Sequence, residues 1–297
     1  MQEYEYITKA MGTDVSISIV SKDKDLADKL GHQTIEEINR YETIFSRFLI
    51  DSELSKLNRE KQMTVSLDFI EVIQEAYELF ILTKGHFNPL VQIARLGYTK
   101  DFKQISSQSD TVDNEMYSID FSLVQIDAQN LIVKLDSGQK LDFGGFLKGY
   151  LAEKLCKKIK TYSNDITGVI VNIGGDLHTQ GFDSENKIFI FSIYNPITQE
   201  DILIPIHNKS LATSGTYKRT WKHSNMLVHH ILDNNGMENS KNEIVSMSII
   251  HEHGGLSEAY AKTFMLLGHS VAQKEFSKDK ITFISINKSG HIAQNIR

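Results

Sequence analysis

The chain is poor in cysteine, in proline and in surplus positive charge. Of its 297 residues, one is cysteine and three are proline. The single cysteine, Cys156, excludes any intrachain disulfide and therefore the small disulfide-stabilised folds. No low-complexity tract marks a linker between domains. The net charge of −6 argues against a broad basic surface for nucleic acid or for an anionic membrane.

Long apolar runs are absent as well. No stretch approaches the roughly 20 apolar residues of a membrane-spanning helix. The first residues contain no basic region followed by an apolar one, as a secretion signal would. We therefore expect no integral membrane segment and no nucleic-acid partner. The expected location is the cytoplasm, unless the chain is one from which an export or lipoprotein signal has been removed.

The cysteine and two of the histidines offer little chemistry by themselves. Cys156 follows Leu155 in an amphipathic stretch, which predicts a buried, small apolar side chain. His251 and His253 would share one face of a strand and so could share a metal ion. No third ligand stands at a recognisable spacing, so exposed or loop histidines are the preferred interpretation.

The periodicity of apolar residues predicts both helices and strands. Helices are expected over 23–45, from Ser66 to Gly85, from about Gly145 along the stripe of leucines that follows it, and over 257–267 up to Gly268. Strands are expected over 5–21, 116–135, 139–143, 169–173, 187–194, 202–206, 244–250 and 281–286. Because helices and strands do not alternate regularly, the sequence predicts an α+β fold of mostly antiparallel sheets with packed helices.

The junction over residues 142–150 is rich in glycine and polar groups. Its glycines allow a backbone to approach a ligand closely, and the start of the following helix offers free N–H groups to a phosphate. Lys148 adds a positive charge there, and Asp142 could accept a hydrogen bond from a ribose or a base. A tight turn carrying a surface lysine is the alternative that this stretch leaves open.

Three further junctions have a similar polar character. Residues 172–176 form a second glycine turn after a buried strand, and residues 212–219 form a third. The histidines at the end of a strand over 229–233 could take a proton from a hydroxyl nucleophile. Each of these signals is weak when taken singly.

Eight short motifs occur together and in one order along the chain. They are Met-Gly-Thr at 11–13, Ser-Glu-Leu-Ser-Lys-Leu-Asn at 52–58, Gly-His-Phe-Asn-Pro at 85–89, Asp-Phe-Gly-Gly-Phe-Leu-Lys-Gly-Tyr at 142–150, Asn-Ile-Gly-Gly-Asp at 172–176, Tyr-Asn-Pro at 194–196, Thr-Ser-Gly at 213–215 and His-Ile-Leu-Asp at 230–233. In this order they resemble the FAD:protein FMN transferases, the ApbE family, from about residue 10 to residue 268. The resemblance implies an ApbE-like, T-fold-like architecture. Residues 1–297 would form a single domain, with two sub-lobes and a cleft between them.

The resemblance also implies an activity and a partner. Members of this family cleave the pyrophosphate of FAD, which is a substrate, and attach FMN through a phosphoester to a threonine hydroxyl of a partner flavoprotein, releasing AMP. A divalent ion, usually Mg²⁺, sits at the pyrophosphate. Phosphoryl transfer asks a protein mainly for positioning and for neutralisation of charge.

Individual residues take expected roles from the matching motifs. The residues expected to contact FAD are Met11, Phe48, His86, Phe87, Asn88, Asp142, Lys148 and Ile231, and the family usually has Asp where Asn88 stands. His230 matches the histidine that deprotonates the acceptor threonine, and the carbonyl of Gly145 matches a metal contact. Ordinary core packing is the alternative for Phe48 and Phe87, and a structural strand-end histidine is the alternative for His230.

The chain departs from the family at the metal-binding helix. Glu258 stands where the family has a metal-binding aspartate, and Lys262 stands where it has a metal-binding threonine. Glutamate remains a hard oxygen ligand, but an ammonium cannot bind Mg²⁺. Thr263 would replace the missing ligand only if the helix register shifted. Glu258 and Lys262 are also spaced for a simple helical ion pair on the surface.

This departure leaves several hypotheses open. In the first, Lys262 takes over the place of the metal in an active transferase. In the second, the chain binds FAD without transferring FMN. In the third, water attacks the bound FAD and the products are FMN and AMP.

Overall fold

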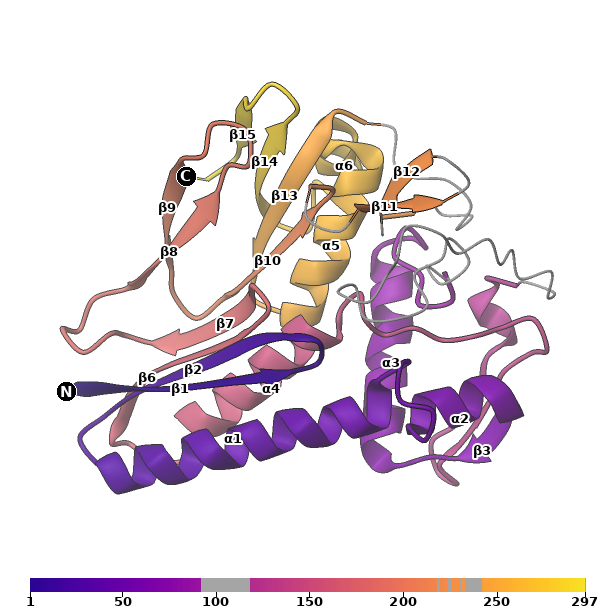
Figure 1. The fold of residues 1–297 in the computed structure, drawn as a ribbon, viewed down its shortest axis with the longest axis horizontal. Coiled ribbons are helices and arrows are strands. Elements are labelled where there is room, and N and C mark those ends of the chain that lie inside the picture. The colour runs from indigo at the N-terminus through magenta and orange to yellow at the C-terminus, as the bar shows by residue number, and fades with distance from the viewer. Residues whose placement is uncertain (92–117, 218–219, 224–225, 230, 233–241, 297) are drawn as a thin grey trace. The chain divides into compact units, whose positions relative to one another are not determined.

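The computed structural model describes residues 1–91, 118–217, 220–223, 226–229, 231–232 and 242–296, with the backbone alone for 220–223 and 226–229. The chain divides into two compact units (Figure 1). Unit 1 comprises residues 1–40, 146–214 and 242–297, and unit 2 comprises residues 41–145 and 215–241. In the part of the chain that the structure describes, no helix is long and apolar enough to cross a membrane.

Unit 1 is built on an eight-stranded sheet with the order β1-β2-β6-β7-β10-β13-β14-β15. Its strands are β1 (Gln2–Ala10), β2 (Thr13–Ser21), β6 (Ile166–Ile173), β7 (Asp176–Gly181), β10 (Ser210–Gly215), β13 (Ile244–His251), β14 (Thr282–Asn287) and β15 (Ile292–Gln294). The pairings β1–β2, β2–β6, β6–β7, β7–β10, β13–β14 and β14–β15 are all antiparallel. The predicted α+β class with mostly antiparallel sheets is therefore confirmed.

The first strand expected from the sequence is in fact a hairpin. β1 pairs with β2 along its whole length: Gln2 lies opposite Ser21 at one end, and Ala10 lies opposite Thr13 at the other. Met11 and Gly12 connect them with φ angles of 53° and 69°, as a two-residue hairpin turn requires. The alternation of apolar residues continues through both strands, and Met is an unusual residue at positive φ, so the sequence pattern concealed the turn.

Helices cover one face of this sheet. The helices that begin in unit 1 are α1 (Lys24–Phe45), α4 (Leu147–Lys160), α5 (Gly254–Leu267) and α6 (His269–Glu275). α4 packs on β6 and β7, and α5 packs on β13 (Figure 1). The leucine stripe of α4 is buried as predicted, and so is Cys156. Gly268 ends α5 as expected, but the helix begins at Gly254, three residues before the predicted start.

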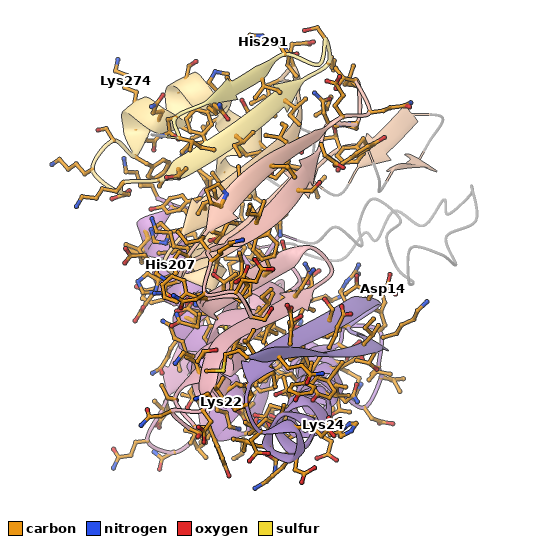
Figure 2. The ribbon with its side chains drawn as sticks, turned by 90° about the vertical axis from the view of Figure 1, so that its left-hand side faces the viewer. Asp14, Lys22, Lys24, His207, Lys274 and His291 are labelled. Atoms are coloured by element: carbon orange, nitrogen blue, oxygen red, sulfur yellow. The ribbon has the colours of Figure 1, made fainter. Side chains whose placement is uncertain are left out.

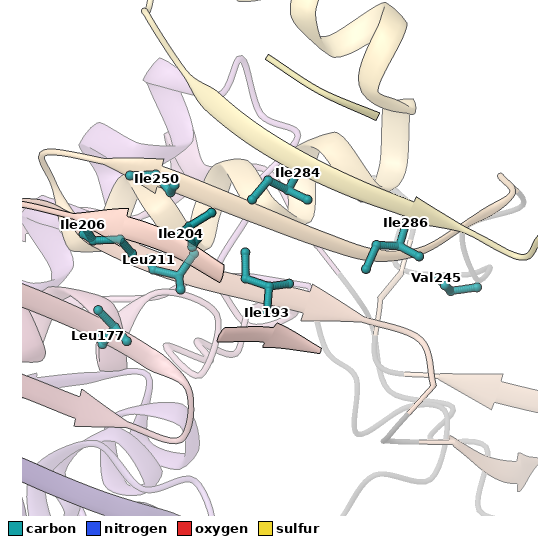
Figure 3. Packing of buried hydrophobic residues seen from close by; sticks show 9 residues of the cluster. All are labelled: Leu177, Ile193, Ile204, Ile206, Leu211, Val245, Ile250, Ile284 and Ile286. Carbon is teal, nitrogen blue, oxygen red and sulfur yellow. The ribbon is translucent and has the colours of Figure 1, made fainter. Parts of the chain in front are cut away.

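A hairpin of β8 (Phe189–Tyr194) and β9 (Asp201–Ile206) packs on the opposite face of the sheet. The alternation of side chains along β14 separates the two faces. Ile284 and Ile286 join Ile204 of β9 in one apolar cluster (Figure 3). Phe283, which precedes Ile284, points the other way, with its ring centroid 5.8 Å from that of Phe264 in α5. The part of the sheet formed by β13 and β14 is therefore covered on both faces.

Unit 2 combines short helices and strands around an aromatic core. Its elements are α2 (Glu53–Glu60), β3 (Gln62–Thr64), α3 (Leu67–Leu82), the 3₁₀ helix η3 (Phe121–Leu123), β4 (Gln125–Asp127), β5 (Ile132–Lys134), β11 (Thr220–His223) and β12 (Met226–His229). The rings of Phe45, Phe69 and Phe143 pack together with centroids 5.4–5.8 Å apart. Ser66 caps α3 by accepting a hydrogen bond from the Phe69 N–H, as its position in the sequence predicts.

Three expectations for unit 2 differ from the structure. The helix expected up to Gly85 ends at Leu82, with Thr83 as its C-cap residue. Gly85 lies two positions after that cap, at φ 80°, and donates its N–H to the Phe80 carbonyl. The strand expected over 139–143 is irregular, because the Asn58 amide binds both the N–H and the carbonyl of Leu141. The described part of 116–135 contains η3 and the β4–β5 hairpin in place of one long strand.

The stability of unit 1 should fall in mild acid because of His178 in β7. This side chain is fully buried, with Nδ1 2.7 Å from the Ser210 hydroxyl, and burial lowers its pKa from 6.5 to about 4. Between these values the unfolded chain binds a proton that the folded chain excludes. The free energy of unfolding therefore rises with pH over this window, by up to about 3 kcal/mol. Urea unfolding at pH values below and above 6.5 measures the change. The His178→Gln variant should lose this pH dependence of the free energy of unfolding. An equal pH dependence in that variant would contradict its assignment to His178.

Candidate functional site

The helices α4 and α5 of unit 1 cross with their backbones in contact. A Cβ atom placed on Gly149 would come well within 3.0 Å of the Gly254 carbonyl oxygen, and the reverse also holds. Real Cβ atoms essentially never approach so closely, so only glycine fits at either position. The two glycines thus bring the first turns of both helices side by side.

Each helix caps the other with a carboxylate. Glu258 of α5 accepts the Gly149 N–H through Oε1 at 2.5 Å, and Glu153 of α4 accepts the Gly254 N–H through Oε2 at 2.6 Å. The N-cap residues of the two helices make no side-chain capping bond themselves. The exchanged carboxylates therefore satisfy free N–H groups of the first turns and face the positive ends of both helix dipoles.

Lys148 lies between two carboxylates beside this crossing. Its ammonium forms an ion pair with Asp176, the first residue of β7, and lies 3.8 Å from Glu258 Oε2. The side chains of Lys148, Asp176 and Glu258 are only 16%, 8% and 6% exposed. Burial and the neighbouring Asp176 charge raise the pKa of Glu258 to about 7, against the opposing effects of Lys148, Lys262 and the Gly149 N–H. A buried charge cluster thus forms at the start of α4.

The residues around Glu258 do not fit a magnesium site. One carboxylate oxygen accepts the Gly149 N–H, and the other faces the Lys148 ammonium. Lys262 follows one helical turn later, while the buried Thr263 hydroxyl donates to the Ala259 carbonyl at 2.9 Å. Among the described residues, no group of three or more His, Cys, Asp or Glu side chains could hold a metal ion. The donor set offers a cation where Mg²⁺ requires oxygen ligands.

A second polar group belongs to unit 2 and contains Arg47, which the sequence analysis missed. Arg47 Nε lies 3.3 Å from Asp142 Oδ2, and the guanidinium lies 4.4 Å from the centroid of the Phe48 ring. Asp142 also accepts the Gly144 N–H at 2.9 Å. The Phe48 ring is 46% exposed, so it is not an ordinary core residue. It offers an open aromatic surface, and Asp142 is held in a fixed position near it through Arg47.

The motif over 85–89 is held by its own hydrogen bonds. Phe87 is buried and its N–H donates to the Thr83 hydroxyl. The Asn88 amide donates to the Ile119 carbonyl and accepts the Leu90 N–H, both at 2.9 Å. An aspartate at this position could not make the first of these bonds when ionised. His86 is half-buried.

The remaining residues singled out in the sequence lie as follows. Met11 is half-buried in the β1–β2 turn of unit 1, whereas Gly145 and Ile231 are buried in unit 2. His230 lies outside the described residues. His253 is exposed and donates its N–H to the His251 ring.

Sequence reasoning missed Glu153 and Arg47 and gave Asp176 no role of its own. Glu153 and Lys157 look like an ordinary i,i+4 surface pair, and the carboxylate does accept from Lys157. Its second bond, to Gly254, joins residues 101 positions apart, which helical spacing cannot reveal. For Asp176 the signal was its place directly after the glycine turn.

The fold of the chain has counterparts among solved structures. An ApbE protein from Thermotoga maritima superposes with a TM-score of 0.86 at 23% identity, covering 99% of this chain and 97% of that chain. A flavin transferase ApbE from Vibrio cholerae superposes with a TM-score of 0.80 at 19% identity, covering 99% of this chain and 96% of that chain. The fold is therefore that of the ApbE proteins.

The sequence comparison gives the family. The family model described as "ApbE family" matches residues 11–284, so the chain belongs to the ApbE family. A relative from Klebsiella pneumoniae (strain 342), named FAD:protein FMN transferase, is 25% identical over 261 residues, which cover 83% of this chain and 77% of the relative. A protein of the same name from Escherichia coli (strain K12) is 22% identical over 302 residues, which cover 95% of this chain and 83% of the relative.

The Glu153 cap should contribute stability that is lost in acid. Burial alone would raise the pKa of Glu153, but hydrogen bonds from Lys157 and Gly254 outweigh it and lower the pKa from 4.5. A lowered pKa stabilises the folded state above 4.5, and this contribution disappears as the pH falls through the folded-state value. Glu153→Gln should cost about 1 kcal/mol at neutral pH and progressively less below 4.5.

Urea unfolding of the variant against wild type measures this difference at each pH. The matched control is Glu185→Gln, which removes an exposed ion pair with Lys187 and should change stability little. Equal costs for the two variants at neutral pH would show that the Glu153 carboxylate does not act as a cap.

Proposed function

We propose that this chain transfers FMN from FAD to a threonine hydroxyl of a partner flavoprotein and releases AMP. The family match over residues 11–284 carries the proposal, and the curated relatives reported above share the name FAD:protein FMN transferase. In this proposal residues 1–297 act together as one transferase domain, and FAD is a substrate.

The charge cluster of unit 1 supports a role at the diphosphate of FAD. The first turn of α4 is the positive end of the helix dipole, and Lys148 adds a positive charge beside it. Both features favour an anion at this helix end. Asp176 limits the movement of Lys148 through their ion pair. Lys148 is therefore the proposed contact of the diphosphate.

The groups of unit 2 support a role at the flavin and the dinucleotide. The exposed Phe48 ring can stack on a planar ring system. His86, Phe87 and Asn88 are the further proposed flavin contacts. The proposed dinucleotide contacts are Asp142 and Ile231, and Met11 in the β1–β2 turn of unit 1 is the remaining proposed contact of FAD.

The chemical step needs one base and one leaving group. The threonine oxygen attacks the phosphorus of the FMN half, a P–O bond forms, and the P–O bond to AMP breaks. We assign the threonine proton to His230, by resemblance, since this residue lies outside those described. The family resemblance implies Mg²⁺ at the diphosphate and the Gly145 carbonyl and Glu258 as its ligands, but the surroundings of Glu258 do not fit that ion. No step assigned here passes through a metal.

Incubation with FAD and a peptide containing Ser-Gly-Ala-Thr, the kind of acceptor segment that the family resemblance implies, tests the proposal. Mass spectrometry should show the peptide heavier by one FMN, with AMP released in equal amount. Lys148→Met should lower the transfer rate about 10- to 100-fold, because a charge-assisted contact to the diphosphate is lost. Lys148→Arg should recover part of the rate, and Lys158→Met, an exposed lysine of the same helix, should match wild type.

Two other outcomes would overturn the proposal in different ways. Tight FAD binding without peptide modification would identify a flavin-binding protein. Release of FMN and AMP without modified peptide would identify a pyrophosphate hydrolase.

A further inference from the structure

The charge cluster at the α4–α5 crossing is made of four side chains of this chain. Lys148 and Lys262 bring two ammonium groups, and Asp176 and Glu258 bring two carboxyl groups. All four belong to unit 1. Lys148 contacts both carboxylates, and Lys262 follows Glu258 by one turn on α5. The positive charge that acts on Glu258 therefore comes from side chains of this chain, and Lys148 is held in place by its contact with Asp176.

The same contacts occupy the groups that a metal ion would need. The Gly149 N–H fixes one Glu258 oxygen, at the point where the backbones of Gly149 and Gly254 are in contact. Lys148 faces the other oxygen. A divalent ion placed beside Glu258 would meet the Lys148 ammonium at short range, and the positive charge of Lys262 also acts on this position, so like charges would repel it. The half-buried Lys262 also supplies no lone pair while it is charged.

We infer that this chain works without a divalent metal ion, and that Lys148 and Lys262 supply the positive charge at the diphosphate. This inference rests on the proposed FMN transfer. The ammonium groups form and break no bond: the threonine oxygen still displaces AMP from phosphorus, and both lysines remain protonated throughout. Phosphoryl transfer requires positioning and charge neutralisation, and the two ammonium groups supply the positive charge without coordinating the substrate.

Metal binding tests the inference separately from transfer. Mn²⁺ is titrated into the full chain and followed by electron paramagnetic resonance, with and without saturating FAD, against a blank of FAD alone. Wild type should bind no Mn²⁺ beyond the blank. Lys262→Thr removes a like charge and adds an oxygen ligand, so it should bind one Mn²⁺ at least about tenfold more tightly than wild type. The matched control is Lys274→Thr, an exposed lysine that projects from α6, and it should behave as wild type (Figure 2).

Transfer to the Ser-Gly-Ala-Thr peptide gives the second measurement. Wild type should keep its rate within about twofold in excess EDTA, since its reaction uses no metal ion that the chelator could remove. Lys262→Thr should lose transfer in EDTA and regain it with Mg²⁺. One Mn²⁺ bound by wild type, or wild-type transfer that EDTA abolishes and Mg²⁺ restores, would overturn the inference.

The two measurements also distinguish the inference from the proposed function. If no condition gives transfer, the proposed function fails, while the Mn²⁺ titration still decides whether the cluster excludes a divalent ion. If Lys262→Thr does not fold, the wild-type titration and the wild-type EDTA response decide by themselves.

Discussion

The contact between the backbones of Gly149 and Gly254 is the constraint on which the arrangement of unit 1 depends. Because neither position tolerates a side chain, the first turns of α4 and α5 approach until a carboxylate from each reaches the N–H groups of the other. The same approach places Lys148 beside Glu258. Packing, capping and the charge of the candidate site are therefore consequences of one helix crossing.

This constraint also explains why the departure at Lys262 is compatible with a folded protein. A lone ammonium beside buried apolar groups would be costly, but Glu258 lies one turn away and is already fixed by Gly149. Asp176 balances Lys148 in the same way. The cluster thus carries its own counter-charges, and the family fold accommodates a cation where its relatives are expected to provide an oxygen ligand.

The sequence predicted those features that depend on local patterns. The α+β class, the Ser66 cap, the buried stripe of α4 and the position of Lys148 at a helix start all follow from spacing over a few residues. The β1–β2 turn was missed because Met11 carries no turn signal, and the strand at 139–143 was wrong because a side chain, Asn58, takes the place of a partner strand. Neither the Glu153 cap nor the contact of Arg47 with Asp142 was predictable, since each joins distant segments.

The order of strands in the large sheet has a consequence for synthesis of the protein. β1 and β2 come from the first residues of the chain, whereas β13, β14 and β15 come from its last third, and β6, β7 and β10 join them from between. On the ribosome, the N-terminal hairpin must wait for most of the chain to emerge before the sheet is complete. Such long-range pairing slows folding and leaves apolar strands exposed meanwhile, which makes the nascent chain a natural client for chaperones.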